Sequence, residues 1–156
     1  MIDIKKSLYS FAFDKEVTGI SLLSQEESNL FWHEYIDDKK ENYFKFEESN
    51  WIIKSKKKII DNDYTDDFNN EIKENIISKF NFVEWLDLDC VYFCLNKNTI
   101  IVTSWTIFKE NWIEFLYIES DCSFLINIEN NKKESLIFTN LGQIQFVPST
   151  DMFLER

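Results

Sequence analysis

The chain of 156 residues carries 28 acidic and 17 basic side chains, which gives a formal net charge of −11, and its one arginine is Arg156. Arginine is the usual residue for bidentate contacts with phosphates and base edges, and phosphate binding needs a positive field. The composition therefore argues against a reader of nucleic acid. Hydrophobic residues make up 44% of the chain and aromatic residues 17%, so it can bury a core and does not resemble a disordered acidic tail.

Length and cysteine usage predict a single globular domain, residues 1–156, in the cytoplasm. One domain has roughly 150 residues, and no stretch approaches the about 18 apolar residues of a membrane span. Residues 1–6 lack the basic start and apolar block of a secretory signal. The three cysteines, Cys90, Cys94 and Cys122, include no CxxC pair and indicate buried reduced thiols.

The first half of the chain predicts one strand and two helices. Aromatic residues alternate with small ones over residues 9–13, which favours a half-buried strand. Ser24 followed by Glu27 forms a capping-box pattern that begins a helix ending near Tyr35. We expect the inner side of this helix to carry Leu30, Phe31 and Tyr35.

The second predicted helix covers residues 65–80. Thr65 can cap it, and Asp66 and Asp67 stand in its first turn, where the helix dipole favours anions. Apolar residues recur every four positions up to Phe80, which is typical of an amphipathic helix.

The second half predicts a β-hairpin, a helix and three strands. Apolar runs at 91–95 and 99–103 flank Asn96-Lys97-Asn98, which favours a hairpin. Helical spacing follows from Trp105 to Leu116, and strands are expected at 124–128, 135–139 and 143–147 with a tight turn at 140–142. The fold class is therefore α+β, an antiparallel sheet (hairpin plus C-terminal meander) with about three helices packed on it, on one side.

No sequence motif indicates a particular reaction. Asp61, Asp63, Thr65 and Asp67 match the opening of a calcium loop, but its glycine and glutamate positions are Asp66 and Ile72. His33 is the one histidine and has no nucleophile or second ligand at a recognisable spacing. We therefore expect no catalytic residue, no cofactor and no metal.

Acidic residues gather in three windows without a base, 61–71, 80–96 and 110–128. Such a surface raises the rate of encounter with a basic partner, and neighbouring aromatic residues can anchor an interface. The partner-binding residues predicted from these windows are Asp61, Asp63, Asp66, Asp67, Glu84, Trp85, Asp87, Asp89, Glu119 and Asp121.

The stretch from Cys90 to Val147 resembles immunity proteins of bacterial contact-dependent growth inhibition and other polymorphic toxin systems. The likeness lies in residues 91–93, 103–108, 111–116 and 136–138 and in Gly142. It implies a protein that binds the C-terminal domain of a cognate toxin, expected to be a basic nuclease, and blocks its active or substrate-binding surface. It carries over no functional residue by position, and residues 1–60 match nothing.

Two other functions remain open at this point. One is an acidic mimic of nucleic acid that inhibits a DNA-binding enzyme by the same charge logic. The other is a small metal-dependent hydrolase in which paired carboxylates such as Asp87 and Asp89 do acid–base work beside apolar residues. Several unrelated DNA-binding partners would favour the first, and thermal stabilisation by a divalent cation would favour the second.

Overall fold

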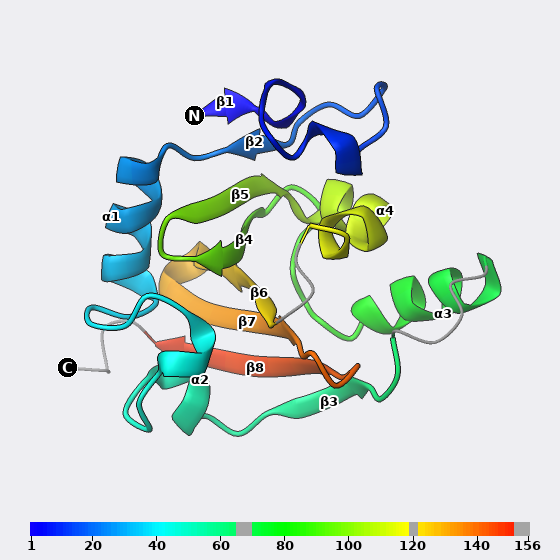
Figure 1. Ribbon diagram of the computed structural model, residues 1–156. Helices are drawn as coiled ribbons and strands as arrows, with labels where there is room; N and C mark the ends of the chain where they lie inside the picture. Colours follow the sequence, from blue (N-terminus) through cyan, green and yellow to red (C-terminus); the bar gives the residue numbers. More distant parts are fainter. Residues whose placement is uncertain (65–69, 119–121, 152–156) are drawn as a thin grey trace.

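One eight-stranded antiparallel sheet forms the centre of the protein (Figure 1). The computed structural model describes residues 1–64, 70–118 and 122–151. The strand order is β1-β2-β5-β4-β6-β7-β8-β3. The strands are β1 (Ile2–Asp3), β2 (Ser21–Leu22), β3 (Lys58–Asp61), β4 (Cys90–Asn96), β5 (Thr99–Ser104), β6 (Ser123–Asn127), β7 (Lys132–Phe138) and β8 (Ile144–Asp151).

Helices cover both faces of this sheet. They are α1 (Gln25–Tyr35), α2 (Trp51–Lys54), α3 (Asn70–Phe80) and α4 (Trp105–Leu116), with short 3-10 helices η1 (Ile4–Lys6), η2 (Ser10–Ala12), η3 (Tyr43–Lys45) and η4 (Glu129–Asn131). Figure 1 shows α1 and α2 on one side of the strands and α3 and α4 on the other. All five residues of β6 are buried, so the expectation of a sheet covered on one side was wrong.

Aromatic side chains fill the core under α3 and α4. The α4 residues Trp105 and Phe108 stack at 5.9 Å, and Phe108 lies 4.9 Å from Phe115 between ring centroids. Phe80 of α3 meets Trp112 edge to face at 6.0 Å. The predicted helical spacing from Trp105 onward is thus confirmed as a core-facing stripe.

The α+β class, the hairpin β4–β5 and the C-terminal meander β6–β7–β8 are confirmed. Gly142 adopts a left-handed φ of 90° in the tight turn before β8. α1 has the predicted capping box, because Ser24 Oγ accepts from the Glu27 amide and Glu27 Oε1 accepts from the Ser24 amide.

Two details of the first half differ from expectation. Residues 9–13 form no strand, since Ser10–Ala12 coil into η2 and Phe13 is buried in the core, 5.0 Å from the Phe115 ring. Leu30 is exposed, because Phe31 and Trp32 fill the inner side of α1. α3 is described over Asn70–Phe80, within the predicted helix, and the predicted cap at residues 65–67 lies outside the described residues.

Gly19 is a position where the backbone needs glycine. Its φ is +82°, and a Cβ there would lie 2.7 Å from Cδ1 of Ile107 in α4. Its carbonyl accepts a hydrogen bond of 2.8 Å from Thr103 Oγ1 on β5. The turn before β2 therefore sits close against α4.

We expect Gly19→Ala to lower the free energy of unfolding by about 1–2 kcal/mol from its left-handed backbone alone, with a further loss from the Ile107 contact. Ile107→Val removes the clashing Cδ1 atom, so Gly19→Ala should cost less in that background. Urea denaturation of the two single variants and the double variant measures the coupling. Equal costs in both backgrounds would contradict the contact.

Candidate functional site

The segment from Phe82 to Asp89, between α3 and β4, presents apolar and acidic side chains together. Phe82, Leu86 and Leu88 are 70%, 67% and 87% exposed. Glu84 and Asp87 are exposed beside them. We call residues 82–89 the acidic ledge. Exposed apolar groups surrounded by charge are a typical composition of a protein-binding surface.

Buried residues hold the acidic ledge in place. Val83 and Trp85 belong to the core under α3 and α4, and the Trp85 ring lies 4.9 Å from that of Trp105, edge to face. The Trp85 indole N–H donates to Glu134 Oε1 of β7 at 3.0 Å. Trp85, predicted as a partner contact, therefore supports the ledge from inside.

The ledge carboxylates differ in their environment. Asp89 Oδ2 accepts from the Leu86 amide at 3.0 Å and from Asn127 Nδ2 at 3.1 Å, so Asp89 shapes the loop. Asp87 is 71% exposed and pairs with Lys109 of α4 at 3.1 Å. Asp87 and Glu84 are consequently the ledge carboxylates that face solvent.

A cleft of about 290 Å³ lies beside the ledge, between it and the strands β6, β7 and β8. Phe82, Trp85 and Phe146 supply its apolar lining. The charged lining consists of Glu84, Asp89, Glu129, Glu134 and Lys132. Its net negative charge extends the acidic surface of the ledge onto the sheet.

Of the other predicted site residues, the structure describes Asp61 and Asp63, and neither belongs to residues 82–89. Asp61 of β3 is largely buried and pairs with Lys79 of α3 at 2.5 Å, and its Oδ2 accepts from the Asp63 amide at 3.0 Å. Asp61 thus has a structural ion pair where a calcium loop would need a ligand. Asp66, Asp67, Glu119 and Asp121 lie outside the described residues.

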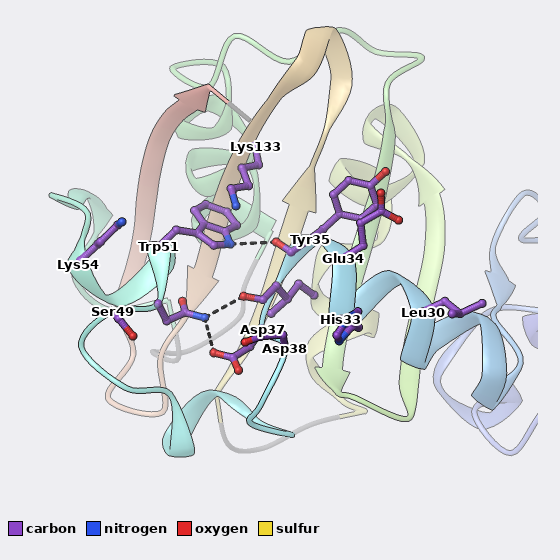
Figure 2. A pocket seen from close by; sticks show the side chains of 12 residues that line it. Leu30, His33, Glu34, Tyr35, Asp37, Asp38, Ser49, Trp51, Lys54 and Lys133 are labelled. Atoms are coloured by element: carbon purple, nitrogen blue, oxygen red, sulfur yellow. Dashed lines mark hydrogen bonds between the residues drawn. The ribbon is translucent and has the colours of Figure 1, made fainter. Parts of the chain in front are cut away.

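A larger hollow, the α1–α2 groove, opens on the other face of the sheet (Figure 2). Its volume is about 800 Å³, within the range of ligand-binding pockets. α1 and the residues after it form one wall, and residues 49–54 and Lys133 of β7 form the other. Sequence reasoning missed this groove because its residues are scattered over three segments.

Asn50 fastens the two walls of the groove together. Its Nδ2 donates to the Ile36 carbonyl at 2.8 Å and to Asp37 Oδ2 at 2.9 Å, and its Oδ1 caps α2 by accepting from the Ile52 amide at 2.8 Å. The neighbouring Trp51 indole donates to the Tyr35 carbonyl at 2.9 Å. These bonds fix the end of α1 against the start of α2.

Asp37 is ionised as part of this clamp. Burial opposes its charge, but hydrogen bonds from the Lys40 amide, Asn50 and the Lys39 amide outweigh burial and hold the pKa of Asp37 below its ordinary 3.8. Its contribution to stability is present above that value and is lost as the pH falls through the folded-state pKa.

Neither the ledge nor the groove contains a cluster of metal ligands. In the described part of the chain, no three His, Cys, Asp or Glu side chains gather to hold an ion.

The protein is of the α+β class, with the acidic ledge on one face of its sheet and the α1–α2 groove on the other. A family model described as "Protein of unknown function (DUF2947)" matches residues 9–147. The chain belongs to this family. Neither the curated proteins nor the solved structures compared with it gave a match. Among the residues that the structure describes, no helix has the length and apolar character to cross a membrane.

We expect Asn50→Ala to lower the free energy of unfolding by about 2–3 kcal/mol, since it removes a helix cap and leaves buried acceptors unpaired. Asn50→Asp keeps the cap but sets a second carboxylate against Asp37. Its deficit should shrink as the pH falls from 7 to 4.5, because one proton between the two carboxyls restores a donor. Urea denaturation at both pH values checks this, and a pH-independent deficit for Asn50→Asp would argue against the clamp.

Proposed function

We propose that this protein is an immunity protein that binds the toxic domain of a cognate bacterial effector and blocks its active or substrate-binding surface. The observation that supports it most is the acidic ledge, where exposed Phe82, Leu86 and Leu88 stand beside Glu84 and Asp87. The protein acts by stoichiometric binding in the cytoplasm, without catalysis.

The ledge has the properties of a pre-organised contact surface. Its buried Trp85 and the hydrogen bonds to Asp89 reduce the conformational entropy that binding would otherwise cost. Its exposed apolar side chains can be desolvated against a partner, while its carboxylates steer the encounter.

A nuclease toxin would complement this surface. Its substrate-binding face must be positive to hold phosphates, and the ledge and its cleft offer Glu84, Asp87, Glu129 and Glu134. Docking of the ledge on that face would exclude the nucleic acid by charge and by volume. The same charge logic holds for any basic partner, so the partner's identity has to come from experiment.

A pull-down from the native host, with this protein as bait at low and then high salt, tests the proposal. One stoichiometric partner that is toxic when expressed alone, and harmless when co-expressed with this protein, is the expected result. Several unrelated DNA-binding proteins would instead identify a nucleic-acid mimic. Absence of any specific partner would contradict both.

We expect the double variant Glu84→Lys and Asp87→Lys to slow association with the toxin domain about tenfold or more at low salt, since electrostatic steering raises on-rates by that order. Leu86→Ala with Leu88→Ala should mainly speed dissociation. The matched control is Glu16→Lys with Glu26→Lys, two exposed acids elsewhere with the same charge change. Stopped-flow kinetics at two salt concentrations measures all three, and equal slowing by the control would place the interface elsewhere.

A further inference from the structure

The α1–α2 groove continues across α1 into a second hollow. That hollow measures about 280 Å³ and shares Leu30, His33, Asp37 and Asp38 with the groove. Leu30 is 65% exposed and, with His33, forms the ridge between the two. The concave surface is therefore elongated and open, which suits a stretch of chain better than an enclosed small molecule.

The charge of this surface differs from that of the rest of the protein. Five lysines and four carboxylates line the two hollows, in a chain whose net charge is −11. In the groove the charges are separated by wall, as Figure 2 shows: Lys54 and Lys133 lie on the side of Trp51, and Glu34 lies on the side of α1. A purely basic partner would meet the lysines unfavourably here.

The two walls of the groove combine an aromatic ring with fixed polar groups. The Lys133 ammonium lies 4.9 Å from the centroid of the Trp51 ring, so the indole and the cation form one surface. Asp37 and Asn50 bond to each other and to the backbone. Glu34 and Asp38 are exposed on the wall formed by α1 and the residues after it.

We propose that the α1–α2 groove binds an extended segment of a partner protein that carries an acidic side chain, a basic one and an apolar one in that order. The acidic side chain contacts Lys54 and Lys133, the basic one contacts Glu34 and Asp38, and the apolar one packs on Leu30. The identity of the protein that carries this segment rests on the proposed function. The binding chemistry of the groove does not.

A library experiment tests the groove without that protein. A random linear heptapeptide phage library is selected on the full chain, and the enriched peptides are measured on two variants. Lys54→Glu with Lys133→Glu reverses the cationic wall. Lys6→Glu with Lys15→Glu is the control, at two exposed lysines outside the groove. Each replacement changes the charge by −2, so both variants go from −11 to −15.

We expect enriched peptides of mixed charge that bind the groove variant at least about tenfold more weakly, as for the loss of close charge pairs, and bind the control as they bind the parent. A thermal melt equal to that of the parent shows that the variant is folded. No enrichment, purely basic peptides, or equal losses in both variants would overturn the inference. Self-association that the groove variant abolishes would overturn it in favour of a second copy.

The two proposals can fail separately. If the toxin is found and the ledge variants weaken its binding, but mixed-charge peptides do not bind, the groove inference falls and the immunity function stands. If the peptides bind the groove and the host yields no toxin, the immunity proposal falls and the groove remains a binding site.

Discussion

The requirement that the sheet be covered on both faces governs the rest of this structure. β6 is buried at every residue, and its neighbours Phe93 of β4 and Leu136 of β7 are fully buried as well. A sheet buried on both sides cannot alternate apolar and polar residues, and each face needs its own helices. In a chain of 156 residues the helices that cover each face are short, so large aromatic side chains fill the space between helices and sheet. Trp105, Phe108 and Trp112 do this under one cover, and Trp32 and Trp51 under the other.

Each of the two layers of helices carries one of the two candidate binding surfaces. The acidic ledge is the connection from α3 into β4, fixed by Val83 and Trp85 in the core of one face. The α1–α2 groove lies between the helices of the other face, and hydrogen bonds from Asn50 and Trp51 hold its two walls together. Both are rigid for the same reason: the side chains that shape them are also core residues or helix caps. Surfaces of this kind lose little conformational entropy on binding.

The sequence predicted the parts of the fold whose signals are local. The Ser24–Glu27 capping box, the hairpin around residues 96–98 and the aromatic stripe from Trp105 each lie within a short window, and all three have the expected structure. The misses have long-range causes. β1 and β2 have two residues each, and β3 pairs with β8 more than eighty positions away, so no periodicity marks them. The continuous apolar run in β6 was the signal for a sheet covered on both faces, because apolar and polar residues would alternate in a half-exposed strand.

The candidate surfaces show the same difference between local and long-range signals. Charge windows point to residues 82–89 because this acidic stretch is contiguous in the sequence, and the structure exposes Glu84 and Asp87 there. They could not distinguish Asp87, which faces solvent, from Asp89, whose oxygen bonds Leu86 and Asn127, because that difference depends on β6. Nor could composition find the α1–α2 groove, where Glu34, Lys54 and Lys133 come together from three segments. The net charge of −11 hides that lysine-bearing surface, so net charge alone describes the acidic ledge and not the α1–α2 groove.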